Sequence, residues 1–222
     1  MALSRLKYNS LNVTPTASKG IGFDSGADDL AATFSGGEMT FIKKLTADGS
    51  GTTLSFVDGT SDVVLDNTYK EYLFTFKNIH PANDGTSLTF NMSIDSGSNY
   101  NVTKTTTGFT ALHNEADSAA ALGYDTGDDL AQSTAYSILT VGGGTGNDND
   151  ENVSGTLRLF NPSSTTFVKH FIATVNNTQS SAYCITGFSA GYGNTTSAVD
   201  AIQFKFAAGN IDAGDICLYG IN

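Results

Sequence analysis

Apolar and polar residues alternate with a period of two over much of this chain. In residues 87–95, SLTFNMSID, the alternate positions Leu88, Phe90, Met92 and Ile94 are apolar and the positions between them are polar. A period of two is that of a β-strand with one buried face. The segment therefore predicts a half-buried antiparallel strand that ends in a turn rich in serine and glycine.

Two further segments are apolar on both sides of the strand that they predict. Residues 69–79, YKEYLFTFKNI, carry Leu73 besides their alternating aromatic side chains, and residues 165–175, TTFVKHFIATV, carry Ile172 opposite Phe171. Strands with two apolar faces are typical of the centre of a sheet that is covered on both sides. We therefore expect both segments to be central strands.

The alternation continues to the end of the chain. Residues 201–206 place Ile202, Phe204 and Phe206 on one face, and residues 211–221 are apolar on both faces. The second pattern predicts a last strand that lies inside the sandwich with a neighbour on each side. A terminus held in this way resists fraying. The pattern leaves open whether the two strands pair directly or belong to different sheets.

Other segments predict little helix. Residues 114–124 and 128–139 contain alanine and leucine, but their glycine, hydroxyl and β-branched residues allow only one or two short helical turns. Residues 141–155, VGGGTGNDNDENVSG, predict an exposed loop. Together the patterns predict an all-β fold, an antiparallel, jelly-roll-like β-sandwich of eight or more strands over residues 36–222.

The first 35 residues differ from the rest of the chain. They combine a short basic and apolar start (Leu3, Arg5, Leu6, Lys7 and Tyr8) with small residues and a proline. One interpretation is an N-terminal arm over residues 1–35 that attaches the protein to a partner. The other is a first edge strand followed by a loop. The cluster of cations in an acidic chain favours attachment.

Charge and composition exclude several classes of partner. The chain has 22 acidic and 11 basic residues, and such a surface repels nucleic acid. It has neither an apolar run long enough to span a membrane nor the pattern of a signal peptide, so we expect no membrane insertion and no secretion signal. Strands that are polar but carry few charges are common in extracellular and virion-surface proteins. We expect Cys184 and Cys217 to be small buried side chains, and the alternative is a disulfide between neighbouring strands, which the sequence does not require.

The sequence predicts no catalytic residue and no cofactor. His80, His113 and His170 lack the spacing of a zinc site. The nucleophile motif of serine hydrolases is absent. Asp128 and Asp129 lie in a polar context, whereas an acid that cleaves glycosidic bonds needs an apolar cleft.

One acidic segment is a weak candidate for a metal site. In residues 147–152, Asp148, Asp150 and Glu151 place hard oxygen ligands close together, as calcium requires. The segment does not match the EF-hand pattern, because Val153 stands where the turn glycine belongs. The alternative is a solvated acidic loop.

Aromatic residues are a further signal of interaction. Tyr183, Tyr192 and Tyr219 could rim a binding surface or a subunit interface. Packing within a sheet explains most aromatic residues of such a chain, so no single tyrosine is assigned a role.

Three stretches resemble structural proteins of tailed bacteriophages, particularly marine ones. They are TYKEYLFTFKNIHP, FNPSSTTFVKHFIATV and GYGNTTSAVDAIQFKFAAGNIDAGDICLYGI, within a resemblance over residues 65–222. Chains of that group typically close with a strand similar to GxIxLYGI, here Gly214 to Ile221. Cys217 occupies a position where a polar residue would be ordinary.

The resemblance implies a non-enzymatic module on the virion surface that is assembled in the host cytoplasm. Its expected role is that of a tail-fibre or receptor-binding-type protein that contacts a host surface receptor. The expected partners are other virion proteins, through the N-terminal arm, and further copies of the chain in a homotrimer. A capsid decoration or cement protein is the alternative, and a surface-glycan depolymerase is a remote one.

Overall fold

The computed structural model describes residues 19–23, 30–35 and 39–222, and the chain forms two compact units, 1–40 and 41–222. In the first unit, β1 (Lys19–Phe23) and β2 (Leu30–Ser35) pair antiparallel. The basic and apolar start of the predicted arm lies outside the described residues. Across the described residues, no helix has the length and apolar character needed to cross a membrane.

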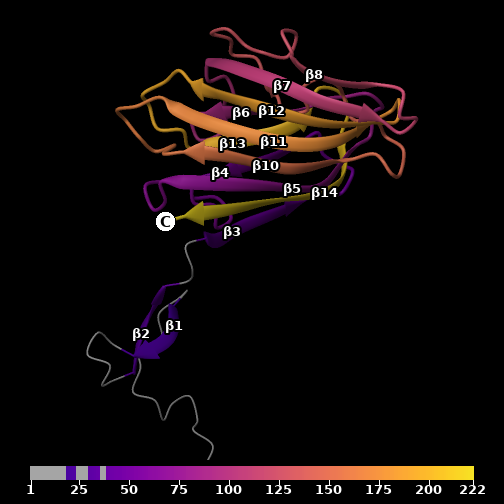
Figure 1. Ribbon diagram of the computed structural model, residues 1–222. Helices are drawn as coiled ribbons and strands as arrows, with labels where there is room; N and C mark the ends of the chain where they lie inside the picture. Colours follow the sequence, from indigo (N-terminus) through magenta and orange to yellow (C-terminus); the bar gives the residue numbers. More distant parts are fainter. Residues whose placement is uncertain (1–18, 24–29, 36–38) are drawn as a thin grey trace, which may run out of the picture. The chain divides into compact units, whose positions relative to one another are not determined.

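The second unit consists of two antiparallel sheets that pack against each other (Figure 1). The eight-stranded sheet has the order β3-β14-β5-β10-β11-β12-β7-β8, and the four-stranded sheet has the order β4-β13-β6-β9. The strands are β3 (Met39–Thr46), β4 (Thr53–Val57), β5 (Glu71–Pro81), β6 (Leu88–Ser93), β7 (Lys104–Asn114), β8 (Ala120–Tyr124), β9 (Ser137–Ile138), β10 (Val153–Phe160), β11 (Lys169–Gln179), β12 (Tyr183–Gly193), β13 (Ala201–Phe206) and β14 (Ile211–Ile221). The prediction of an all-β antiparallel sandwich is confirmed.

Phe204 of β13 lies at the centre of the packing between the sheets. Its ring centroid is 5.3 Å from that of Phe74 and 5.2 Å from that of Phe76, both on β5 of the opposite sheet. It is 6.3 Å from Phe56 and 6.3 Å from Phe90, on the two strands beside β13. Edge-to-face and tilted aromatic pairs add about 0.5–1.5 kcal/mol each to the free energy gained by burial. The cluster therefore joins the four-stranded sheet to the eight-stranded one.

The end of the chain is held as the alternation predicts. Ile202, Phe204 and Phe206 are buried, and β13 belongs to the four-stranded sheet. The chain then crosses to the other sheet, where β14 lies between β3 and β5. The main chain of the last strand is thus hydrogen-bonded on both sides, and Ile216 and Leu218 are fully buried in the core.

The prediction for β6 is wrong in one respect. All six of its residues are buried, whereas the alternation predicts a solvent-exposed polar face. Two other segments cover that face, because the Asn91 Nδ2 group donates to the carbonyl oxygens of Tyr100 at 2.7 Å and Thr134 at 2.9 Å. Ile94, expected in the core, follows the strand and is 43% exposed.

The predicted helical turns are strands in the structure. Residues 120–124 form β8, which pairs with β7, and residues 137–138 form β9. The turn before β8 is closed by Asn114, whose Oδ1 accepts the backbone N–H groups of Ser118 and Ala119, each at 2.9 Å. Hydrogen bonding to the edge of β7 outweighs the helix propensity of the alanines, which the neighbouring glycine and serine residues weaken.

The predicted loop at 141–155 is largely not exposed. Residues 141–146 are buried or half-buried, only 147–150 are exposed, and β10 begins at Val153. The glycine-rich part packs on the inner face of β12, where a Cβ on Gly187 would lie 3.0 Å from the Val141 nitrogen. Glycine on both sides permits this close backbone approach, so the same residues that predict a loop instead fill the sandwich.

The two segments expected at the centre of a sheet are central, but one of them has an open face. β5 lies between β14 and β10, and β11 lies between β10 and β12. Phe171 and Val175 of β11 point into the core, whereas Ile172 on the other face is 53% exposed. The prediction that both faces of β11 are covered is therefore wrong for the described residues.

We expect Phe204→Ala to lower the free energy of unfolding by about 3–5 kcal/mol, because it leaves a cavity between the two sheets. Urea unfolding measures this loss. Phe167→Ala is the control, since Phe167 is 68% exposed, and it should change stability by less than about 0.5 kcal/mol. A loss below about 1 kcal/mol for Phe204→Ala would contradict its central place in the core.

Candidate functional site

An irregular pairing of β5 and β14 shapes one end of the eight-stranded sheet. The register shifts twice between Ile211 and Asp215. Asn78 on β5 has a φ of 50°, and Gly214 on β14 has a φ of 108°. A Cβ on Gly214 would lie 2.4 Å from the carbonyl oxygen of Asn78, so only glycine permits this pairing. The irregular pairing is a bulge, and bulges change the direction of neighbouring side chains. A polar pocket lies beside it.

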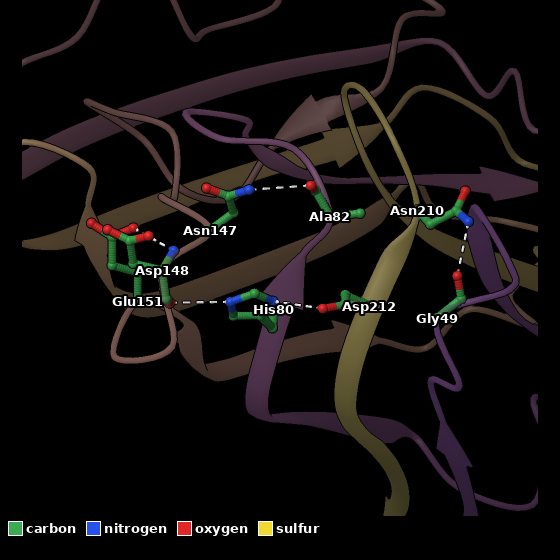
Figure 2. Close-up of polar contacts among 8 residues, drawn as sticks. All are labelled: Gly49, His80, Ala82, Asn147, Asp148, Glu151, Asn210 and Asp212. Carbon is green, nitrogen blue, oxygen red and sulfur yellow. Dashed lines mark hydrogen bonds and ion pairs between the residues drawn. The ribbon is translucent and has the colours of Figure 1, made fainter.

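His80 is one of the residues that line that pocket, and Figure 2 shows its ring between Asp148 and Asp212. Its Nδ1 atom lies 3.2 Å from Asp212 Oδ2, and its Nε2 atom lies 3.2 Å from the carbonyl oxygen of Asp148. Both partners are hydrogen-bond acceptors. A protonated imidazolium can donate to both, whereas a neutral ring can donate to only one.

The pocket is a hollow of about 330 Å³ with a polar lining. Amide, imidazole and carboxylate groups can hydrogen-bond a polar ligand, but the lining contains no serine, cysteine or lysine nucleophile. The lining residues are Asn78, His80, Asn149, Asn152, Asp212 and Ala213.

The acidic segment that was a candidate for calcium lies beside His80, but its carboxylates are not gathered around one point. Glu151 is buried, and its Oε2 atom accepts the Asp148 N–H at 2.9 Å. A Cβ on Gly146 would lie 2.0 Å from the same oxygen, so the Glu151 carboxylate fills the inside of the turn. Asp148 and Asp150 are exposed. Among the described residues, no three histidine, cysteine, aspartate or glutamate side chains are placed to hold a metal ion.

The three histidines are on different strands and are not brought together. His113 of β7 lies 3.1 Å from Asp117 in the following turn. The ring of His170 on β11 is 6.0 Å from that of Tyr192 on β12. Each histidine thus has its own local partner.

Asp128 and Asp129 also have separate partners. Asp128 Oδ2 accepts the Gly142 N–H at 2.8 Å, and burial raises the pKa of the Asp128 carboxyl above its ordinary value. Asp129 Oδ2 accepts the Tyr124 hydroxyl at 2.5 Å. The Asp128 carboxylate thus anchors the glycine-rich segment against the sheet, which is a structural role.

Two buried lysines are a feature that sequence reasoning missed. Lys104 and Lys169 are fully buried in one row of the eight-stranded sheet, with Gly193 between them. The Lys104 ammonium donates to Asn91 Oδ1 at 2.5 Å and to the Val102 carbonyl oxygen at 2.8 Å. Among the described residues, neither lysine has a carboxylate within ion-pair distance. Burial lowers the pKa of Lys104 to about 7 and lowers that of Lys169 below its ordinary value.

The prediction that both cysteines are buried is right for one of them. Both cysteines are free; Cys217 is buried as expected, but Cys184 is exposed, because it lies near the end of β12 on the outer face.

Tyr183, Tyr192 and Tyr219, the three tyrosines that could rim a binding surface, are all half-buried. Tyr219 packs edge-on against Phe41 of β3 at 5.6 Å. The three tyrosines come from two strands, β12 and β14.

A cluster of exposed apolar side chains lies on the outer face of the eight-stranded sheet. We call it the outer apolar face and define it as Phe109, Leu122, Tyr124, Ile172 and Phe188. Strand register places Phe109 beside both Tyr124 and Phe188, and the Phe109 and Phe188 rings stack at 4.6 Å. The exposed fractions are 45% for Phe109, 75% for Leu122, 54% for Tyr124 and 53% for Ile172. Apolar patches of this kind mark contact surfaces.

The sequence contains one signal for this face. In β12, CITGFSAGYG, small residues alternate with Phe188 and Tyr192. The small residues Gly187 and Ser189 are the buried ones, so the larger side chain between them points outward. Alternation alone suggests the opposite assignment.

Comparison with known proteins identified no relative of this chain. No family model matches the chain, and neither a curated protein nor a solved structure matches it.

Lys104→Met should change how stability depends on pH. In the folded protein the pKa of Lys104 is about 7, below the ordinary 10.5, so between these values the unfolded chain binds more protons. The stability of the wild type should therefore rise with pH, relative to the variant, by about 1 kcal/mol per unit between about pH 7.5 and 10. Below pH 7 the cost of the buried charge is fully present.

Urea unfolding at several pH values measures this difference. Lys77→Met, which alters an exposed lysine, is the matched control and should leave the pH dependence of the wild type unchanged. A Lys104→Met variant whose stability runs parallel to that of the wild type would show that the buried amine does not titrate in this range.

Proposed function

We propose that this protein is a non-enzymatic structural module of a tailed-phage particle, displayed on the particle surface as a tail-fibre or receptor-binding-type protein. The segments that resemble such proteins include all of β5, β13 and β14 and most of β11, and these strands carry much of the core. In this proposal the module is assembled in the host cytoplasm, its N-terminal segment attaches it to other virion proteins, and copies of the chain associate, as in a homotrimer.

The outer apolar face is the observation that carries this proposal. A surface of aromatic and aliphatic side chains that bear no charge suits contact with another protein. The polar pocket around His80 supplies hydrogen-bonding groups, and its lining residues include no serine, cysteine or lysine. Together they favour a protein that assembles and binds over one that catalyses a reaction.

A capsid decoration protein is the second candidate. Such a protein holds on to the shell, and an apolar surface suits that contact. The outer apolar face therefore favours this role as well, with a shell protein in place of a neighbouring fibre subunit.

Electron microscopy of purified particles with an antibody against this chain tests the proposal. We expect the protein in the particle, with label at the tail; label on the head would favour decoration. Particles that lack the protein would contradict both roles. New reducing ends after incubation with host polysaccharide would contradict a non-enzymatic role.

A further inference from the structure

The outer apolar face has both a projection and a recess. Leu122 of the edge strand β8 projects with 75% of its surface exposed. A hollow of about 160 Å³ lies further in on the same sheet, between Phe109, Ile172, Phe188 and Ala190. An apolar protein cavity of about 150 Å³ holds benzene, so this hollow has room for one leucine side chain.

The charge of the chain indicates what occupies the hollow. With 22 acidic and 11 basic residues the net charge is −11, so two copies repel each other over most of their surfaces. The five side chains of the outer apolar face are uncharged, although the Tyr124 hydroxyl, at the end of the edge strand β8, donates to the Asp129 carboxylate. Copies can therefore approach with least repulsion at this face, whereas a basic or nucleic-acid partner gains no electrostatic attraction there.

We infer that Leu122 of one copy inserts into the hollow between Phe109, Ile172, Phe188 and Ala190 of a second copy of the same chain. In a two-fold pair each copy gives and receives one leucine. In a closed ring each copy gives its leucine to the next. Both arrangements bury the most exposed apolar side chain of β8 and cover the stacked Phe109 and Phe188 rings.

This inference rests on the self-association in the proposed function and identifies the contact that produces it. The edge position of β8 is part of the argument. Its five residues are all exposed, and it carries no charged residue and no proline. Edge strands of monomeric proteins commonly carry such residues to prevent association, so their absence from β8 agrees with a contact there.

Two variants test the two sides of the contact separately. Leu122→Asp removes the projection and adds a charge, and Ala190→Phe fills the hollow. Each should weaken association by about tenfold or more, measured by sedimentation velocity and light scattering up to about 100 µM protein. Phe167→Asp is the matched control, because Phe167 is 68% exposed and outside this face, and it should associate like the wild type. Circular dichroism and urea unfolding show that each variant is folded.

Mixing the two variants gives the decisive result. The intact Leu122 of Ala190→Phe can enter the intact hollow of Leu122→Asp, which restores one of the two contacts of a pair, so an equimolar mixture should associate more strongly than either variant alone. A mixture that associates no more strongly than the separate variants, or a Leu122→Asp variant that associates like the wild type, would overturn this contact alone. A wild type that is monomeric at about 100 µM would overturn self-association altogether, while the location on the particle would still be decided by microscopy.

Discussion

The packing of Phe204 between the two sheets is the interaction on which the rest of the structure depends. It places β13 against β5, and β5 is the neighbour of β14 and β10 in the larger sheet. Once this contact forms, the inner face of the eight-stranded sheet is occupied by the four-stranded sheet and by the glycine-rich segment. The four strands of the smaller sheet do not cover all eight strands of the larger one. The glycine-rich segment covers the part that remains, and it lies close to the inner face of β12 because the side chains there are those of glycine and serine.

That arrangement uses one face of the large sheet for folding and leaves the other for contact. On β11 the side chains of Phe171 and Val175 pack in the core, while that of Ile172 is on the outer face and is exposed to solvent. Four of the exposed large apolar side chains, Phe109, Leu122, Tyr124 and Ile172, lie on the outer face of β7, β8 and β11. Strand alternation thus separates the buried face of the large sheet from its outer face, and in our proposal the outer face is the one that contacts another protein.

Strand alternation correctly predicted features that depend on residues close together in the sequence. It missed features that depend on residues far apart in the sequence. Ile202, Phe204 and Phe206 are buried as their spacing indicates, because one face of a strand is set by the pleat alone. The alanines of 119–121 favour a helix, and only pairing with β7 makes Ala120 and Ala121 part of a strand. The polar pocket joins His80 to Asp212, which are 132 residues apart (212 − 80). Neither the bulge at Gly214 nor the register that stacks Phe109 on Phe188 can be seen in a single segment.

Hydroxyl-radical footprinting of the wild-type protein at low and high concentration tests the central claim most directly, because it reports the accessibility of each side chain. The account predicts that Phe109, Leu122 and Ile172 become protected as the concentration rises, whereas Phe167, which is exposed outside this face, does not. Protection of Phe167 or of the His80 pocket with an unchanged outer apolar face would contradict it.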